Sequence, residues 1–397
     1  MKKNYPLPLW ILVIGAFAIG MTEFVIMGLL PNVASDLNVS VSTAGQLITG
    51  YALSVAIGGP IIVIATYKLS QKNILMLLMA IFILGNFLSV IAPNYGLLMT
   101  SRIITALAHG SFFGIGAIMA ANLVSPNRRA SAMALMFSGL TVSNIIGVPF
   151  GTFVGQHMGW RASFFIIAVI GIVTLLGIVF LVPKKESAEK ATLIKELAVL
   201  KSGKLWLTLL VALFSLSSVF AVFTYITPIL MQVTGFHASV VSLILVIFGI
   251  GVTVGNVIGG KLADWHMNKA IVRLLIVFEL FFVLLYFMQF HKLLMVLGVF
   301  LFGVIAFSML PSMQYRSMLV SKDAPTLSST LNQSAMNVGN AMGAFVGGLS
   351  VAYFPLKHLV LIAPLLSLIG FIILIIQLSV MKRHAVYNSP LSNEGQG

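Results

Sequence analysis

The sequence of 397 residues contains no cysteine, and its nine acidic residues are far outnumbered by 23 lysines and arginines. Without cysteine the chain forms no disulfide and has no thiolate metal site, and no pair of histidines at helical ligand spacing replaces one. Charged residues make up only 8% of the chain, whereas roughly a quarter of the residues in soluble domains are charged. This composition excludes a soluble globular protein.

The sequence also lacks the patterns of an enzyme. It has no glycine-rich phosphate loop followed by Lys-Ser or Lys-Thr, no cluster of metal ligands, and no long polar loop that would carry either. We therefore predict that the protein is not an enzyme, that it needs no cofactor or metal, and that nucleotide hydrolysis does not drive it.

Apolar residues are abundant instead: they make up 59% of the chain, and the mean hydropathy is +1.08. They form runs of about 20 residues, which is the length of a membrane-spanning helix and is too long for barrel strands. The first run has no small-residue cleavage site behind it, so we expect it to be a retained helix. The sequence predicts an all-α integral membrane protein with twelve spans, at 8–30, 43–66, 73–91, 97–122, 131–154, 163–182, 205–230, 239–262, 270–290, 293–318, 328–352 and 359–380.

The net charge of +14 does not indicate nucleic-acid binding, because the basic residues are dispersed over the loops in twos and threes. When the loops are counted alternately, 19 of the basic residues lie on the side of the N-terminus and three on the opposite side, at Arg161, Lys292 and Lys357. Cytoplasmic loops of membrane proteins carry the excess of lysine and arginine. We therefore predict a multi-pass protein of the cell membrane with both termini in the cytoplasm.

A polar stretch at 183–204 divides the spans six and six. A shift of 197 residues superposes Pro31 on Pro228, and a shift of 196 superposes Asn144-x-x-Gly147-x-x-x-Gly151 on the same pattern at Asn340. The halves therefore look duplicated, as in transporters whose substrate site lies between repeats. The predicted organisation is an N-terminal six-helix bundle at 1–182, a cytoplasmic linker at 183–204, a C-terminal bundle at 205–381 and a cytoplasmic tail at 382–397.

Two motifs carry a resemblance to a known family. Gly260-Lys261-Leu262-Ala263-Asp264 resembles the G-x-L-A-D signature of the major facilitator superfamily, in the loop between the second and third helices of a half. In the first half, Tyr67 stands in place of this aspartate. Gly147-Val148-Pro149-Phe150-Gly151, followed by Gly159-Trp160-Arg161, is similar to the fifth-helix motif of the superfamily's proton-coupled antiporters. The resemblance implies that Gly260, Asp264, Gly147, Pro149 and Gly151 serve conformational change.

The first 165 residues strengthen this resemblance. The stretch from Gly20 to Pro31, with Ala44-Gly45-Gln46 and the segment from Arg102 to Gly114, resembles the twelve-helix drug:proton antiporters, in the branch of sugar-efflux, arabinose-linked and purine-efflux permeases. Ala106 departs from that pattern, which usually has glycine there. The resemblance implies a monomeric transporter that moves by alternating access.

Glu23 is the most informative single residue, because a carboxylate within a membrane span is costly and marks transport or proton handling. Arg102 and His109 are also predicted to lie inside a span. They are seven residues apart and so share one helix face. In this superfamily the first and fourth helices face the central cavity, so we expect Glu23 to stand near His109 as a proton-coupling pair. Glu279 lies in span nine, and we leave it outside the core site.

Candidate substrate contacts are polar or aromatic residues on helices that face the cavity. Gln333 and Asn337 lie on one face of span eleven. Exposing this polar face to lipid would be unfavourable, so we expect it to face the cavity. The full predicted set is Phe113, Phe220, Thr224, Tyr225, Gln333 and Asn337. Amides and aromatic rings suit a small molecule with polar and flat faces, such as a sugar, a nucleoside or an amphipathic drug.

The leading hypothesis is thus a proton-driven exporter of a small organic solute. A proton-coupled importer and a passive facilitator of the same fold remain alternatives. The fifth-helix motif favours export, and the titratable groups within the spans argue against a passive channel. The expected partners are the solute, protons and the lipid bilayer, with no nucleic acid.

Overall fold

The computed structural model describes residues 5–66, 69–125, 129–183, 198–320 and 325–387, although some side chains inside these ranges, among them those of residues 263–266, are not described. All the described regular structure is helical. The helices are α1 (Leu7–Gly28), α2 (Leu30–Asp36), α3 (Val41–Ala65), α4 (Gln71–Val90), α5 (Tyr95–Asn122), α6 (Arg129–Val142), α7 (Val148–Met158), α8 (Trp160–Leu181), α10 (Gly203–Thr224), α11 (Ile226–Pro228), α12 (Ala238–Met288), α13 (Lys292–Val320), α14 (Pro325–Tyr353), α15 (Leu359–Ile362) and α16 (Pro364–Tyr387).

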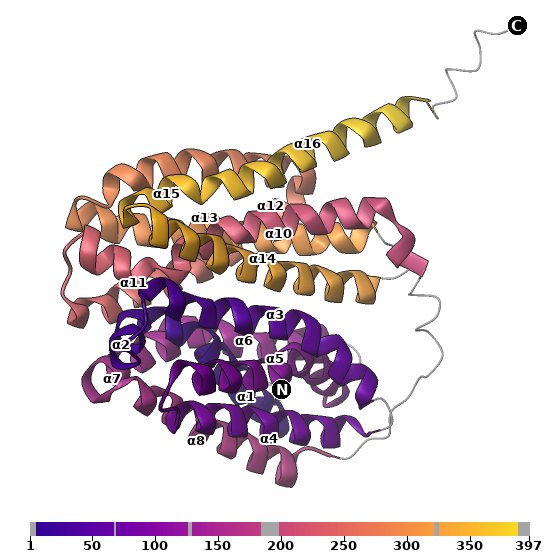
Figure 1. The fold of residues 1–397 in the computed structure, drawn as a ribbon. Coiled ribbons are helices and arrows are strands. Elements are labelled where there is room, and N and C mark those ends of the chain that lie inside the picture. The colour runs from indigo at the N-terminus through magenta and orange to yellow at the C-terminus, as the bar shows by residue number, and fades with distance from the viewer. Residues whose placement is uncertain (1–4, 67–68, 126–128, 184–197, 321–324, 388–397) are drawn as a thin grey trace, which may run out of the picture.

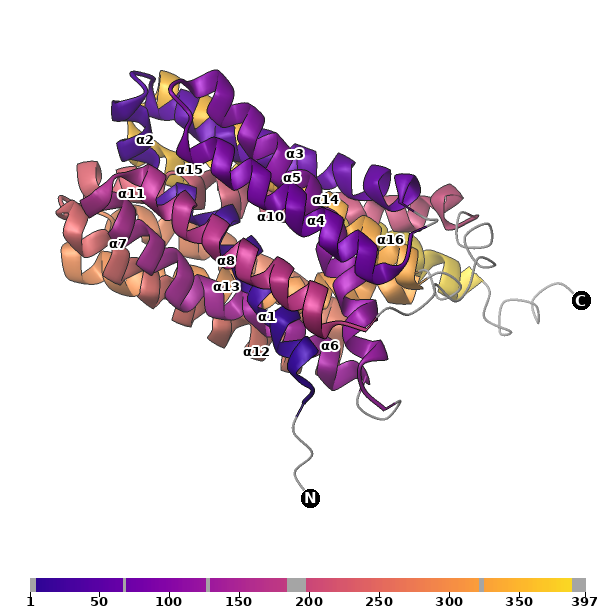
Figure 2. The same cartoon turned by 90° about the horizontal axis from the view of Figure 1, so that it is seen from below.

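The helices gather in two groups that follow the chain. In Figure 1, α1 to α8 form the lower group and α10 to α16 the upper group, with their long axes across the view. Figure 2 shows the same groups from below, with α2 and α11 together at one end of the molecule. Ten described helical segments are long and apolar enough to cross a bilayer. The other two predicted spans correspond to α3 and α14, so the multi-span all-α fold is confirmed.

Two boundaries differ from the sequence prediction. Spans eight and nine form one continuous helix, α12. Its two apolar segments are Ala238–Leu262 and Met267–Met288. The last helix continues to Tyr387, beyond the predicted start of the tail. Most of the predicted linker falls at residues 184–197, outside the described part of the chain. The stretch from Lys261 to Lys269 contains no proline or glycine, so nothing in its sequence breaks a helix.

Three alternate loops meet at one end of the first half. The carboxylate of Asp36, at the end of α2, accepts bonds from Arg161 Nη1 (2.6 Å) and Trp160 Nε1 (3.0 Å), and Arg161 Nη2 donates to the carbonyl of Ala92 (2.7 Å). Gly159 has φ +88° and lets α7 pass directly into α8, which places Trp160 and Arg161 at this end. These contacts place the three loops on one side of the bilayer, as alternating spans require.

This polar cluster lies outside the spans, and its carboxylate stays charged over a wide pH range. The bonds from Arg161 and Trp160 lower the pKa of Asp36 below its ordinary value. A depressed carboxylate pKa means that the interaction is present above that pKa and is lost only as pH falls through it. Acidification to mildly acidic pH therefore leaves this end of the first half tied together.

Within the second half, a row of glycines brings two helices into backbone contact. Gly251, Gly255 and Gly259 recur every four residues on α12, and a Cβ at each would meet the carbonyl oxygen of Phe300, Val304 or Ser308 on α13. Small residues at this spacing allow close helix approach in membranes, where van der Waals packing drives association. The C-terminal half therefore depends on these positions for its packing.

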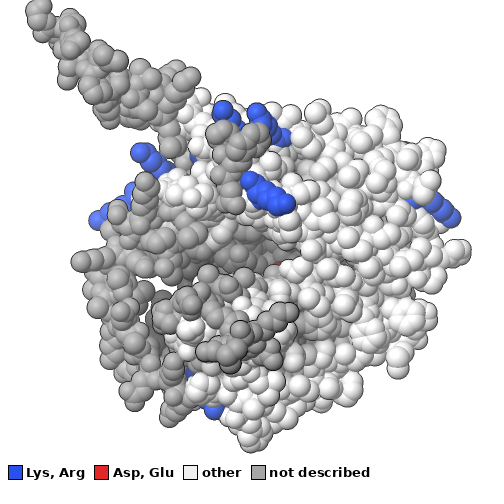
Figure 3. Space-filling view, turned by 180° about the vertical axis from the view of Figure 1, so that it is seen from behind, with Lys and Arg blue, Asp and Glu red and all other residues white. Residues whose placement is uncertain are grey.

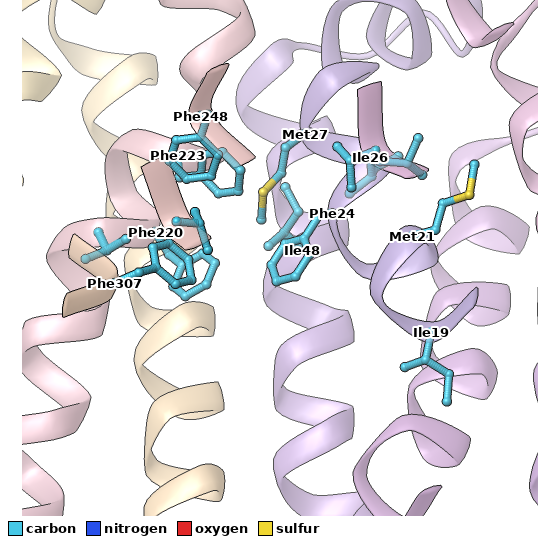
Figure 4. Packing of buried hydrophobic residues seen from close by; sticks show 14 of the residues in the cluster. Ile19, Met21, Phe24, Ile26, Met27, Ile48, Phe220, Phe223, Phe248 and Phe307 are labelled. Carbon is cyan, nitrogen blue, oxygen red and sulfur yellow. The ribbon is translucent and has the colours of Figure 1, made fainter. Parts of the chain in front are cut away.

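The two halves touch through α3 and α14 and through an aromatic cluster at the same end. Ser42 Oγ donates to the Gly348 carbonyl at 2.7 Å, joining the start of α3 to α14. Phe24 of α1 stacks on Phe220 of α10, with ring centroids 6.4 Å apart and planes at 6°. Figure 4 shows Phe24, Met27 and Ile48 facing the rings of the second half. These contacts close the molecule at the end that carries α2 and α11, which is the predicted external end.

The glycine row generates a test of the helix packing. We expect Gly255→Ala to destabilise the protein by about 1–3 kcal/mol, because the added methyl group would overlap the Val304 carbonyl oxygen. Thermal unfolding in detergent, followed by size-exclusion chromatography, measures the effect. Gly260→Ala is the matched control, since a Cβ there meets nothing within 4 Å, and its melting temperature should be unchanged or slightly higher. Equal melting temperatures for the two variants would contradict the packing described here.

Candidate functional site

The site forms around the middle of α1, which is buried along nearly its whole length. Glu23 lies here with 7% of its surface exposed. Its neighbour Thr22 joins three helices: the hydroxyl donates to Asn86 Oδ1 of α4 at 2.7 Å, and the carbonyl accepts from Arg102 Nη1 of α5 at 2.8 Å. The segment of α1 that carries Glu23 is therefore fixed against α4 and α5.

Arg102 is fully buried and is held mainly by aromatic faces. Its guanidinium lies 4.1 Å from the centre of the Tyr51 ring and 5.7 Å from that of Phe164. Among the described residues, Nε and Nη2 of Arg102 have no hydrogen-bond partner. A buried guanidinium with two unpaired nitrogens is costly, and the negative faces of the two rings offset part of that cost. The site thus retains donor capacity that a carboxylate or a ligand can use.

His109 lies between the carboxylate of Glu23 and the ring of Phe113. Its Nδ1 is 3.8 Å from Glu23 Oε2 and 3.1 Å from the hydroxyl of Tyr51. The ring meets Phe113 edge-on, with centroids 5.3 Å apart. The structure therefore brings Glu23, Arg102 and His109 together, as the helix spacing predicts, and the arrangement is chemically able to move a proton between a carboxylate and an imidazole.

Two further members of the cluster were missed by the sequence analysis. Tyr51 of α3 contacts both His109 and Arg102, and Asn86 of α4 anchors Thr22. Tyr51 follows a glycine in an apolar run, and Asn86 is the single amide in the apolar stretch 74–88, so neither stands in a motif. The polarity of Asn86 was the available signal, because an isolated amide inside a span needs a partner.

The aromatic candidates from the second half lie beside the site rather than within it. Phe220 reaches it through its stacking on Phe24, the residue after Glu23. Tyr225 is fully buried at the interface of the halves, where its hydroxyl donates to the Ala344 carbonyl at 3.3 Å and would clash with a side chain at Gly45. Thr224 is also fully buried, and its hydroxyl has no partner among the described residues.

The two amides predicted on α14 have different surroundings. Gln333 is exposed, whereas Asn337 is buried and donates from Nδ2 to the Gln333 carbonyl at 3.0 Å. No described contact joins either amide to Glu23 or His109. The face drawn in Figure 3 is hollowed near its middle, between the upper and lower groups of helices.

The fifth-span motif packs directly on α1. A Cβ at Gly147 would meet Phe17, and one at Gly151 would meet Met21 and Val25, on either side of Glu23 in sequence. Residues Ser143–Gly147 form a π-helical turn before Pro149, which has no N–H to donate to the preceding turn. The motif thus makes an irregular, closely packed helix against the segment that carries the carboxylate.

The remaining candidates lie elsewhere. Gly260 has open space where its side chain would be, and the side chain of Asp264 lies outside the described residues. Glu279, on α12, accepts a bond from Ser367 of α16 at 2.7 Å, away from the cluster. Within the described part of the chain, no group of three histidine or acidic side chains is arranged to hold a metal ion.

Comparison with known proteins identifies the family of this chain and several similar transport proteins. A model of the Major Facilitator Superfamily matches residues 12–330. The inner membrane transport protein YdhP of Escherichia coli (strain K12) is 41% identical over 348 residues, 88% of this chain and 89% of that protein. A probable sugar efflux transporter of Helicobacter pylori (strain ATCC 700392 / 26695) is 28% identical, covering 90% of this chain and 91% of that protein.

The fold also matches solved structures. A bacterial homologue of the human lysosomal transporter Spinster, in an inward-facing and unoccupied conformation, superposes with a TM-score of 0.77. The match covers 94% of this chain and 98% of that chain at 15% sequence identity. At this identity the likeness concerns the fold alone.

The contacts of Tyr51 generate a test of the cluster. Tyr51→Phe removes only the hydroxyl that meets His109 and keeps the ring under Arg102, so we expect a loss of about 1 kcal/mol of stability. Tyr51→Ala also removes the ring and leaves a cavity, and we expect a loss of roughly 3–5 kcal/mol. Thermal unfolding of the purified variants measures both. The control is Tyr353→Ala, at a tyrosine with 78% exposure, which should change the stability little. Equal losses of stability in the two Tyr51 variants would argue against the ring contact.

Proposed function

The chain belongs to the Major Facilitator Superfamily of secondary transporters, and we propose that it exports a small organic solute in exchange for protons. The observation that carries the proposal is the buried cluster of Glu23, His109, Tyr51 and Arg102. Intramembrane ionisable groups are conspicuous in transporters because their burial is costly and marks ion pathways. In this proposal Glu23 binds the transported proton and His109 exchanges it.

In this proposal Arg102 is the second interaction partner of the Glu23 carboxylate, besides His109. Its Nη1 donates to the carbonyl of Thr22, one residue from Glu23, and its Nε and Nη2 have no hydrogen-bond partner among the described residues. When Glu23 is charged, pairing with Arg102 satisfies both groups; when Glu23 is protonated, that attraction is lost and the carboxyl returns toward His109. Protonation thereby changes whether Glu23 of α1 interacts more strongly with Arg102 or with His109 of α5.

The proposed movement follows from where the halves touch. In this structure Phe24 stacks on Phe220 and α2 meets α11, so the predicted external end is closed. Alternating access requires this contact to separate while the opposite end closes. The glycines and the π-helical turn of the fifth span lie against α1, and we propose that they allow α1 to repack between the two states.

Phe113 and Phe220 are the proposed solute contacts on the cluster side, with Gln333 and Asn337 contributing from the second half. Tyr225 and Thr224, which are fully buried here, are proposed to become accessible only when the external end opens. Asp264 and Gly260 are proposed to act at the cytoplasmic surface in the change between states.

Export is supported by the fifth-span motif and by the name of the H. pylori relative. The importer alternative shares the same cluster and differs in the direction in which solute and proton move. The facilitator alternative requires no titratable group, and the burial of Glu23 and Arg102 argues against it. Transport against a gradient in vesicles of known orientation separates the three.

The first functional prediction concerns Glu23. Glu23→Gln keeps the size and hydrogen-bonding capacity of the side chain but cannot release a proton. We expect it to abolish solute movement driven by a pH gradient and to slow solute-for-solute exchange, because the neutral amide resembles protonated Glu23, the form that disfavours solute. Saturating solute should restore exchange, which needs no proton release. Reconstituted vesicles loaded with a radiolabelled solute measure both activities. The control is Glu279→Gln, which changes a carboxylate in a span but outside the cluster and should keep pH-driven transport.

The decisive outcome for Glu23 is the comparison of those two activities. If Glu23→Gln retains full pH-driven transport, the carboxylate is not the coupling group. If exchange is lost even at saturating solute while the variant remains folded, Glu23 serves solute binding rather than proton coupling.

The second functional prediction is that the solute and the proton compete. Reciprocity of linked binding requires that a solute which favours charged Glu23 displaces a proton, and that acid weakens solute binding by the same coupling free energy. We expect up to tenfold weaker affinity for each unit of pH below the midpoint of the titration. Calorimetric titrations in buffers of different ionisation enthalpy measure the protons released. Binding without proton release and without pH dependence would indicate a facilitator.

A further inference from the structure

Phe113 and Phe137 form a pair of stacked rings next to the proton-coupling cluster. Phe113 belongs to α5 and Phe137 to α6, and their centroids are 5.5 Å apart with planes at 6°. Phe112, which is fully buried, meets Phe113 edge-on at 87° and fixes its orientation. His109 meets the other edge of Phe113. The two rings are therefore held parallel by contacts that the sequence motifs do not explain.

The pair lies partly on α6, a helix that contacts α12 of the second half. Phe137 is 43% exposed. Val142, on the same helix and 41% exposed, lies about 140° away around the axis, so the two side chains face different surroundings. Asn144, seven residues or about two turns beyond Phe137, lies on about the same face, and a Cβ at Gly249 of α12 would meet its carbonyl oxygen. Phe137 is thus turned toward the other half.

The described ring contacts of Phe113 and Phe137 are aromatic, and one of them carries a polar group. Met136, the residue before Phe137, is fully buried, and the fully buried Phe112 meets Phe113 edge-on. The polar group at the edge is the imidazole of His109, whose Nδ1 is already turned toward Tyr51 and Glu23. A solute with several hydroxyl groups would leave most of them unpaired on this surface, at considerable cost.

We propose that Phe113 and Phe137 form an aromatic platform that binds a planar aromatic ring of the solute. Offset stacking of a ring on Phe137 continues the existing stack, and a single polar group on that ring lies beside His109. This inference rests on the proposed function and narrows it: the preferred solutes are aromatic compounds rather than simple sugars. The platform also places the solute against the imidazole that exchanges the proton with Glu23.

The test uses a matched pair of ligands, phenyl β-D-thiogalactoside and cyclohexyl β-D-thiogalactoside. They carry the same sugar and rings of similar size, and only the phenyl ring is flat and aromatic. We expect the purified full-length protein in lipid nanodiscs to bind the phenyl compound about 5-fold more tightly, as measured by isothermal titration calorimetry. Phe137→Leu keeps an apolar side chain and should abolish this preference, whereas Phe137→Tyr should retain it.

Phe165→Leu is the matched control, because Phe165 is an exposed phenylalanine of α8 that contacts neither ring of the platform; it should keep the preference. Equal affinity of the two ligands for the unchanged protein, or no binding of the phenyl compound, overturns the platform. So does Phe137→Leu if it weakens both ligands equally, since that indicates general packing. A preference that survives in Phe137→Leu overturns it as well.

The same titrations test the aromatic platform and the proposed proton coupling separately. Proton release on binding without a preference for the phenyl ring contradicts the platform and leaves proton exchange intact. A preference for the phenyl ring without proton release supports the platform and contradicts proton exchange.

Discussion

The structure depends on the cost of keeping Glu23 and Arg102 away from water. Both are buried in the first half of the molecule, and neither forms a conventional buried ion pair with the other. Arg102 is accommodated instead by the Thr22 carbonyl and by the rings of Tyr51 and Phe164. These contacts require α1, α3, α5 and α8 to converge at one level, so the charged cluster sets how the helices of this half are arranged.

Close packing of α1 follows from the same requirement. A carboxylate in the middle of a membrane span has to be surrounded by protein on all sides, because lipid offers it no partner. Glycines on the fifth span bring that helix against α1 near Met21 and Val25. The second half uses glycines in the same way between α12 and α13, and it also buries a charge: Arg316 of α13 donates to Asn268 of α12 at 2.6 Å and to Gln377 of α16 at 2.7 Å. Both halves therefore combine close glycine packing with a buried arginine, and the buried carboxylate beside His109 belongs to the first half.

Much of the fold could be predicted from the sequence because a bilayer permits few structures. The length of the apolar runs, the alternation of basic loops and the polar break near the middle of the chain depend on no tertiary contact. Glu23 and the pair of Arg102 and His109 were also predictable, since a charge in a span and a separation of seven residues are local features. The contact between α2, Ala92 and Arg161 agrees with the predicted sidedness of those loops.

The parts that could not be predicted depend on contacts between helices far apart in sequence. Tyr51 is an ordinary aromatic residue in its span and acquires a role only where α3 meets α5. Phe137 has no motif, and its exposure toward the second half follows from the packing of α6. Tyr225 looked like a ligand contact because it is polar and aromatic, whereas the structure buries it among the glycines of α3 and α14. In each case the neighbours, rather than the residue type, decide the environment.

The position of Phe24 connects the chemistry to the closure of the molecule. Glu23 faces His109 on α5, and the next residue, Phe24, faces Phe220 and Phe223 on α10. Successive residues of a helix point about 100° apart, so one turn of α1 presents the carboxylate to the first half and the aromatic ring to the second. A rotation or shift of α1 that moves Glu23 relative to His109 also moves Phe24 relative to its stacking partner. Coupling between the proton site and the external contact therefore needs no chain of intermediate residues, because a single helix turn carries both.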